Sequence, residues 1–194
     1  MARVETILEF WFGDPNQPAQ GYGQPRSAWF KKDSAFDQAI RHRFLADYEN
    51  AAQGQLASWQ GAPRSCLALV LLLDQFPRNL FRDDRRSFAT DGQALVAARY
   101  ALDCEFDQAL MPVERLFLYL PLEHSENLDD QNRCVALVTA LQARHPEYES
   151  YLDYALRHRE VIQRFGRFPH RNSLLGRETT PAEAEFLKQP GARF

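Results

Sequence analysis

Apolar residues recur along most of the chain at intervals of three and four, the spacing of one face of an α-helix. A clear example follows Asp33, where four apolar side chains stand at this spacing: Phe36, Ile40, Phe44 and Tyr48. Asp33 is a suitable N-cap for this segment, and Gly54 is a suitable stop. The same reasoning predicts further helices that end at residue 12 and that cover residues 56–59, 63–75, 91–103, 112–120, 129–144, 147–165 and 181–189. Thr180 and Glu183 have the spacing of a capping box at the start of the last of these helices.

The pattern therefore predicts an all-α fold, a helical bundle of about nine helices joined by short turns. No run of alternating β-branched residues indicates a strand. No linker or shift in composition divides the chain, so we expect a single all-helical domain over residues 1–194. The segment 63–75 is apolar on every side, which indicates a central, fully buried helix.

Composition narrows the classes of function. The net charge is −3 with neutral histidines, so no overall positive field attracts nucleic acid or anionic lipid. The longest apolar runs, Cys66–Leu73 and Leu116–Leu122, are far shorter than the roughly 20 residues of a membrane-spanning helix. Charged residues in the first turns exclude the apolar core of a signal peptide. We expect a cytoplasmic protein that binds neither nucleic acid nor membranes; the oligomeric state cannot be inferred.

The three cysteines fit this location. They are odd in number and widely spaced, at Cys66, Cys104 and Cys134. This arrangement resembles neither a disulfide framework nor a metal-binding Cys-x-x-Cys pair, so we expect free thiols in a reducing compartment. No Gly-rich phosphate loop, nucleophile elbow or dinucleotide fingerprint is present, and we expect no cofactor and no metal.

Candidate chemistry begins with a charged phrase at the end of the central helix, Asp74-Gln75-Phe76-Pro77-Arg78-Asn79. Pro77 disfavours helical geometry at the residue before it, so the helix is expected to end at Gln75. An isolated buried carboxylate costs several kcal/mol, so Asp74 must be paired. Arg78 is one natural partner, which gives a structural staple between helices; the alternative is a binding site in which Asp74, Gln75, Arg78 and Asn79 face a ligand.

A second phrase, Pro121-Leu122-Glu123-His124-Ser125-Glu126, follows an apolar helix that we expect Pro121 to break. A carboxylate beside an imidazole, as in Glu123 and His124, permits acid–base chemistry. Glu123, Glu126 and Asp130 also have a spacing that could supply oxygen ligands to a divalent cation, although no paired histidine motif supports a metal. For Glu126 and Asp129, the simpler interpretation is that they are anions at the start of the next helix.

The third phrase runs from Arg164 to Asn172 and holds three arginines and a histidine. Gly166 is expected to end the preceding helix, and Pro169 to stiffen a loop that presents His170 and Arg171. Guanidinium groups match carboxylate or phosphate, so this loop suits an anionic ligand. The simpler alternative is that these arginines are surface groups on a turn, or partners for Asp74 and Glu123 within the fold.

Two hypotheses follow. In the first, the protein is a binding protein for a small anionic molecule or a hydrolase-like enzyme that acts on one, with four candidate catalytic residues: His124, His170, Glu123 and Asp74. Its candidate ligand-binding residues are Arg78, Asn79, Gln75, Arg167, Arg171 and Asn172. In the second, the protein is a helical scaffold for a protein or peptide, the charged phrases are structural, and an exposed apolar groove is expected.

The order of these phrases also resembles a known family. The phrases that carry the resemblance are Phe10-Trp11-Phe12-Gly13, Trp29-Phe30-Lys31-Lys32-Asp33, the three charged phrases above, Gly176-Arg177 and Thr180-Pro181-Ala182-Glu183. Together they span nearly the whole chain and are similar to the bacterial domain-of-unknown-function family 924. The resemblance implies a TPR-like arrangement of antiparallel helix pairs. It gives no information about activity or catalytic residues, because the family has no known function. The tetratricopeptide consensus itself is absent.

Overall fold

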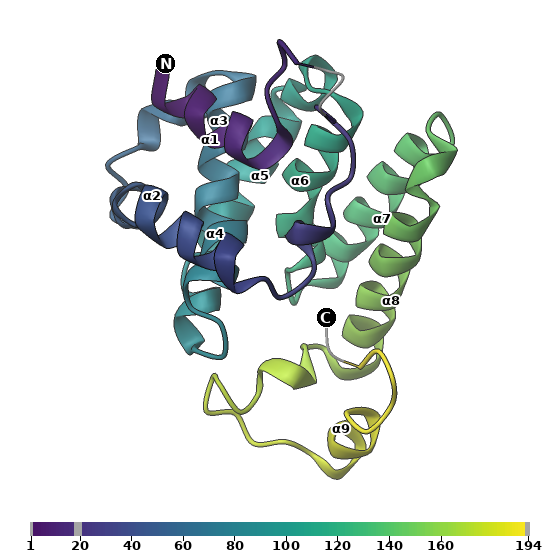
Figure 1. Ribbon diagram of the computed structural model, residues 1–194. Coiled ribbons are helices and arrows are strands. Elements are labelled where there is room, and N and C mark those ends of the chain that lie inside the picture. The colour runs from purple at the N-terminus through teal and green to yellow at the C-terminus, as the bar shows by residue number, and fades with distance from the viewer. Residues whose placement is uncertain (1, 18–20, 193–194) are drawn as a thin grey trace. The chain divides into compact units, whose positions relative to one another are not determined.

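The computed structural model describes residues 2–17 and 21–192, and every regular element in these ranges is helical (Figure 1). The α-helices are α1 (Ala2–Phe12), α2 (Ser34–Ala52), α3 (Pro63–Val70), α4 (Phe76–Leu80), α5 (Asp91–Asp103), α6 (Pro112–Glu123), α7 (Leu128–Gln142), α8 (Glu149–Phe165) and α9 (Pro181–Phe186). Single turns of other helix types are η2 (Ser27–Trp29), η3 (Ala57–Gly61), η4 (Leu71–Gln75), η5 (Arg85–Phe88), η6 (Phe106–Ala109), η7 (Pro146–Tyr148) and η8 (Pro169–Arg171). The predicted all-α class with about nine helices is confirmed.

The chain groups into two compact units. Unit 1 comprises Met1–Arg82 and Arg86–Pro121, and unit 2 comprises Asp83–Arg85 and Leu122–Phe194. The last two residues of α6, Leu122 and Glu123, thus belong to unit 2. That residues 1–194 form a single domain remains a prediction. None of the helices in the described ranges is long and apolar enough to cross a membrane.

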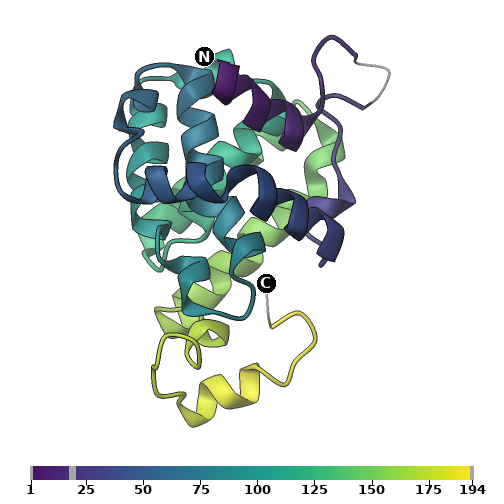
Figure 2. The same ribbon diagram turned by 60° about the vertical axis from the view of Figure 1, so that its left-hand side comes forward.

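Unit 1 is built on an aromatic core. The Trp11 ring of α1 lies 5.4 Å from Phe76 and 5.5 Å from Phe117, measured between centroids, and Trp29 lies 4.7 Å from Phe117. The aromatic phrases near the N-terminus therefore serve as core. The central helix α3 packs against α5. Helix α2 packs against α4 (Figure 2).

The central helix does not end at Gln75, as the proline rule predicted. It passes through a π-helical turn, η4, and continues as α4 to Leu80, with Pro77 in its first turn. A proline deprives the carbonyl four residues earlier of its donor, and that carbonyl, Leu73 O, accepts instead from the Thr90 hydroxyl at 2.6 Å. The wider turn and this remote donor explain why the chain stays helical, since π-turns accommodate one extra residue.

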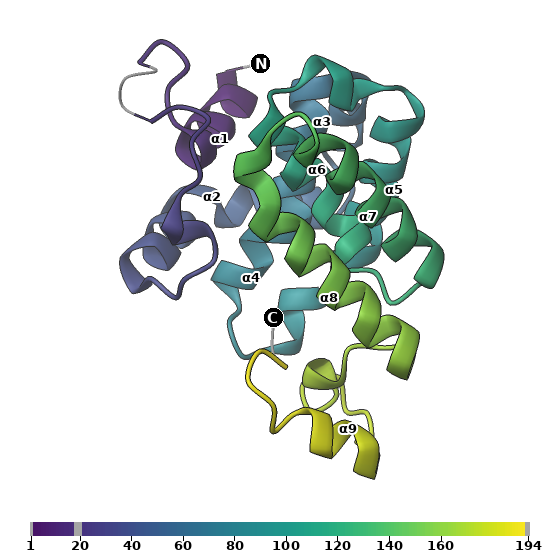
Figure 3. The same cartoon turned by 90° about the vertical axis from the view of Figure 1, so that its right-hand side faces the viewer.

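Unit 2 is built on the pair α7 and α8, which lie side by side along their length (Figure 3). Its apolar cluster consists of Val161, Ile162 and Phe168, with Phe165 and Phe186 packed against it. Gly166 ends α8 with φ +67°, a left-handed conformation that favours glycine, as predicted.

Two further features concern helix ends. The predicted capping box is present at α9, where the Thr180 hydroxyl accepts from the Glu183 N–H and the Glu183 carboxylate accepts from the Thr180 N–H. Pro121, by contrast, does not break α6, which continues to Glu123. A proline this close to the helix end removes a backbone bond only in the last turn, so the break does not occur.

Candidate functional site

Unit 2 gathers four of the predicted site residues around one histidine. His158 of α8 is buried, and its Nδ1 lies 3.3 Å from Oε1 of Glu123 at the end of α6. The half-buried His124 ring stands 6.3 Å from the His158 ring, centroid to centroid. The carboxylate and imidazole that follow one another in sequence therefore both face a third group. We call Glu123, His124, His158, His170 and Arg171 the histidine cluster.

Phe168 connects the remaining members of the histidine cluster to His158. The Phe168 ring is fully buried and lies 5.5 Å from the His158 ring and 5.7 Å from the His170 ring. The guanidinium carbon of Arg171 stands 4.5 Å above the same ring, a cation–π contact. His158 therefore contacts Glu123 on one side and the Phe168 ring on the other, and the Phe168 ring in turn contacts His170 and Arg171, two predicted groups of the third phrase.

The end of α6 is held by Gln131 of α7. The Gln131 side-chain amide donates to the Glu123 carbonyl at 2.5 Å and to the Ser125 carbonyl at 2.7 Å. These bonds satisfy carbonyls that lose their helical partners at a helix end. They fix the backbone that carries Glu123 and His124, so Gln131 positions both side chains.

Burial keeps His158 neutral. Desolvation and the positive charges of His124, Arg171 and His170 lower the pKa of His158 to about 3, and the bond of Nδ1–H to the Tyr154 carbonyl opposes them only in part. A carboxylate 3.3 Å away would ordinarily form an ion pair with an imidazolium. Because the lowered pKa leaves the ring uncharged at neutral pH, we interpret the His158–Glu123 contact as a polar contact rather than a salt bridge. Burial and Glu123 likewise raise the pKa of the Cys134 thiol.

Acid should therefore destabilise unit 2 through His158. Below pH 6.5 the unfolded chain protonates this residue, whereas the folded chain does so only near pH 3. The unfolded state binds the extra proton, so the free energy of unfolding falls by about 1.4 kcal/mol per pH unit as the pH drops through this window. Urea denaturation followed by circular dichroism from pH 7 to 4 measures the slope. His158→Gln should lose this part of the slope, whereas the exposed His42→Gln should retain it; equal slopes in all three proteins would contradict the assignment.

Arginine–carboxylate pairs brace the segment that follows α8. Arg167 contacts Glu183 through two nitrogens, at 2.6 and 2.9 Å, and lowers the pKa of Glu183 to about 2. Arg177 similarly contacts Glu126 at 2.7 and 3.0 Å. Asn172, fully buried, donates to Glu183 and accepts from Arg177. The simpler alternative expected the arginines of the third phrase to pair with Asp74 or Glu123, whereas Arg167 pairs with Glu183.

Glu126 differs from its expected role as a helix-start anion. The helix α7 begins one residue after Asn127, whose side chain accepts from the N–H groups of Asp129 and Asp130. Glu126 precedes this cap and accepts from the Phe168 N–H at 2.8 Å as well as from Arg177. Asp130 accepts from the Ser125 hydroxyl at 2.6 Å. The described residues contain no group of three or more His, Cys, Asp or Glu side chains placed to hold a metal ion.

The first charged phrase lies in unit 1, where its members contact one another. Arg78 Nη1 lies 3.4 Å from the buried Asp74 carboxylate, and the same guanidinium contacts Asp91 at 3.1 Å. The Gln75 amide donates to Asp74 at 2.6 Å, and Asn79 donates to Asp37 at 2.8 Å. The contacts expected of an Asp74–Arg78 staple are therefore present. The first hypothesis places Asp74 in the same site as Glu123, His124 and His170, and this convergence remains a prediction.

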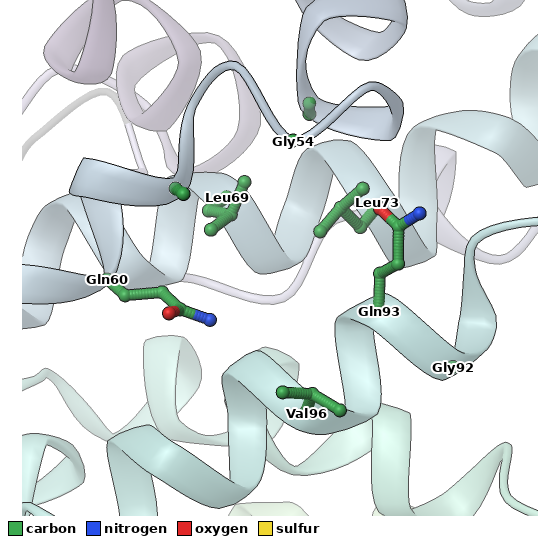
Figure 4. Close-up of a pocket in the computed structure, with 9 residues that line it drawn as sticks. Gly54, Gln60, Leu69, Leu73, Gly92, Gln93 and Val96 are labelled. Carbon is green, nitrogen blue, oxygen red and sulfur yellow. The ribbon is translucent and has the colours of Figure 1, made fainter.

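Two surface hollows lie away from these polar groups. One, in unit 1, has a volume of about 320 Å³ (Figure 4). Leu69 and Leu73 of the central helix, Val96 of α5, and Gly54 and Gly92 line it. The other, in unit 2, has a volume of about 310 Å³ and is lined by residues of α8 and α9 and by residues 189–192. The apolar character of the first matches the groove that the scaffold hypothesis expects.

Sequence reasoning missed His158, Gln131 and the partners Glu183 and Arg177. For His158 a signal was present, because it stands three residues after Ala155 and four before Ile162, on the apolar face of its helix. A histidine at such a position must be buried. No comparable signal marks Arg177 or Glu183 as partners of Glu126 and Arg167, since several opposite charges compete for each.

The fold and the site define an all-helical protein whose buried polar groups cluster at helix ends and match no established catalytic motif. The chain belongs to the bacterial protein family of unknown function DUF924, whose model matches residues 7–191. It is also similar to a solved structure of a protein of unknown function from Agrobacterium tumefaciens, with a TM-score of 0.83 and 40% sequence identity. The match covers 96% of this chain and 97% of that one. No curated protein matches the chain.

These comparisons confirm the family resemblance seen in the sequence. The TPR-like arrangement remains a prediction. Because neither the family nor the similar structure has a described function, a functional proposal has to rest on the site itself.

Proposed function

We propose that the protein binds a small anionic molecule at the histidine cluster and supplies acid–base groups to it. The observation that carries the proposal is the gathering of His124, His170 and Arg171 around the buried His158–Glu123 contact. Three basic side chains from two chain segments lie close enough to His158 for their charges to lower its pKa. Polar groups so concentrated in one place, with a strongly shifted pKa at His158, are more typical of a site than of a core.

Each member has a role in this proposal. Arg171, stacked on Phe168, places a guanidinium in the histidine cluster, a group that suits a carboxylate or phosphate. The half-buried His124 and His170 are the groups that can exchange protons with a ligand, because an imidazole titrates near neutral pH when its environment permits. His158, with its pKa near 3, is too weak a base for this task and orients Glu123 instead.

The other candidate ligand-binding residues hold the fold in this proposal. Arg167 and Asn172 use their donors on Glu183, and Arg78, Gln75 and Asn79 use theirs on carboxylates of unit 1. Asp74 is then a staple rather than a catalytic group. We also place the protein in the cytoplasm, because Cys66, Cys104 and Cys134 are free thiols, as expected in a reducing compartment.

A thermal-shift screen tests the proposal. The wild-type protein is heated with phosphorylated metabolites, with carboxylates and, separately, with divalent metal ions. A ligand present at about 100 times its dissociation constant should add nearly 3 kcal/mol to the free energy of unfolding. His170→Ala should lose the shift, whereas His42→Ala, at an exposed histidine of unit 1, should keep it.

The same screen can contradict the proposal. If no anion shifts the wild-type transition, or if His170→Ala and His124→Ala respond as the wild type does, the histidine cluster is not a ligand site. Far-UV circular dichroism of each variant establishes that it is folded before its response is interpreted.

The apolar hollow of unit 1 favours a second candidate, a helical scaffold that accepts an apolar side chain of a peptide. Val96 is 60% exposed beside the buried Leu69 and Leu73, so an apolar side chain of a bound peptide could pack against these residues (Figure 4). Val96→Glu distinguishes the two candidates within the same screen, because it should leave an anion-dependent shift unchanged. Loss of that shift in Val96→Glu would favour the unit 1 hollow as the binding site.

A further inference from the structure

The hollow in unit 2 is lined by groups that the proposed function does not use. Its volume is about 310 Å³, within the size range of small-molecule sites. The residues that give it its character are Arg157, Glu160, Arg164, Phe165, Phe186 and Gly191. Arg157 and Arg164 stand seven residues apart, two turns along α8, and so lie on one face of this helix. None of these residues belongs to the histidine cluster.

One wall of the hollow is aromatic and carries a stacked guanidinium. The Phe165 and Phe186 rings lie 5.1 Å apart between centroids. The guanidinium carbon of Arg164 stands 4.7 Å from the Phe165 ring and 5.7 Å from the Phe186 ring. Stacking uses the face of a guanidinium and leaves its edge of N–H donors for a planar oxyanion.

Arg164 makes no hydrogen bond or ion pair with any residue in the described ranges; its contacts are those with the two rings. Arg157 is different, because it pairs with Asp153 at 2.7 Å. The position that a Cβ atom of Gly191 would occupy lies 3.8 Å from Arg157 Nη1, an ordinary van der Waals distance, so this guanidinium packs close to the Gly191 backbone. Arg164 is thus the available cation of the hollow, and Arg157 is a second cation that is already partly neutralised.

The charges limit the ligand. Two arginines and Glu160 line the hollow, a net charge of one positive, and Asp153 lies just outside it. A dianion would meet repulsion from Glu160, whereas a singly charged carboxylate balances Arg164. We propose that this hollow binds a monocarboxylate with an aromatic or branched apolar body, whose carboxylate contacts Arg164 and whose body packs on Phe165 and Phe186.

Calorimetric titration of the protein with 1-naphthoate tests the inference. Arg164→Gln should weaken binding at least tenfold, and Glu160→Gln should strengthen it, because it removes the repelling carboxylate. Arg144→Gln, at an exposed arginine of the same unit, is the matched control and should bind as the wild type does. Neutral 1-naphthol should bind at least tenfold more weakly than 1-naphthoate, and inorganic phosphate should not compete.

Three results would overturn the inference: no binding of 1-naphthoate, equal affinity of Arg164→Gln and wild type, or equal affinity for naphthol and naphthoate. His170→Ala separates this inference from the proposed function. It should leave naphthoate affinity unchanged while abolishing the response of the histidine cluster, so either site can fail without the other. Naphthoate binding that is lost in His170→Ala and kept in Arg164→Gln would place the anion at the histidine cluster and reject the hollow.

Discussion

Replacing Phe168 with alanine is expected to lower the free energy of unfolding by about 3–5 kcal/mol, the usual cost of deleting a buried aromatic ring. The ring is fully buried in the apolar cluster of unit 2, and it also contacts His158, His170 and Arg171. Its loss leaves a cavity and removes the surface on which Arg171 is stacked. The variant should therefore lose both stability and the ligand response proposed for the histidine cluster.

Urea denaturation followed by far-UV circular dichroism measures this effect. All three tryptophans, Trp11, Trp29 and Trp59, belong to unit 1, so tryptophan fluorescence reports that unit separately. Tyr154→Ala is the matched control, because its ring lies on α8 but is 52% exposed, and we expect a change within about 1 kcal/mol. A similarly small change for Phe168→Ala would show that unit 2 does not depend on this ring.

The helices were predictable because their information is local. Apolar spacing placed α2, α5, α7 and α8 nearly at their observed bounds, and three helix-end signals were correct at Asp33, Gly166 and Thr180. Each of these signals acts between residues at most four positions apart. The sequence could therefore predict the fold class without any knowledge of tertiary contacts.

The local rule that a proline ends a helix failed at two positions. Pro77 and Pro121 both predicted helix ends, and both lie within helices. At Pro77 the carbonyl left without a donor is satisfied by Thr90, seventeen residues from Leu73, and no local pattern announces that bond. The π-turn that results places Asp74 and Gln75 on the buried side of the chain.

The candidate site was predictable as a set of groups but not as a set of contacts. Glu123, His124, His170 and Arg171 were selected because charged groups follow apolar segments, and the structure gathers these four around His158. Arg167 was selected by the same reasoning, yet it pairs with Glu183, which the sequence indicated only as part of a capping box. The pairing of opposite charges depends on tertiary distances that a single sequence does not contain.

Asp74→Ala is expected to destabilise unit 1 by up to about 3–5 kcal/mol, because it removes the buried carboxylate of an ion pair. Asp74 is 1% exposed, and it accepts from Gln75 and contacts Arg78. Asp91, the second carboxylate on Arg78, limits the loss by retaining one contact. Urea denaturation followed by tryptophan fluorescence measures the change in unit 1, and Asp91→Asn is the matched control, expected to cost less because Asp91 is more exposed.

A double-mutant cycle decides whether the cost belongs to the pair. If Asp74 and Arg78 form a staple, Asp74→Ala and Arg78→Met together should cost less than the sum of the single changes, with a coupling energy of about 0.5–3 kcal/mol. Independent, additive costs would contradict the staple. Asp74→Asn then separates structure from function, because it preserves shape and removes charge. If Asp74→Asn, measured below its unfolding transition, binds anions as the wild type does, Asp74 acts only on stability. If a folded Asp74→Asn protein no longer binds anions, this carboxylate is part of the binding site.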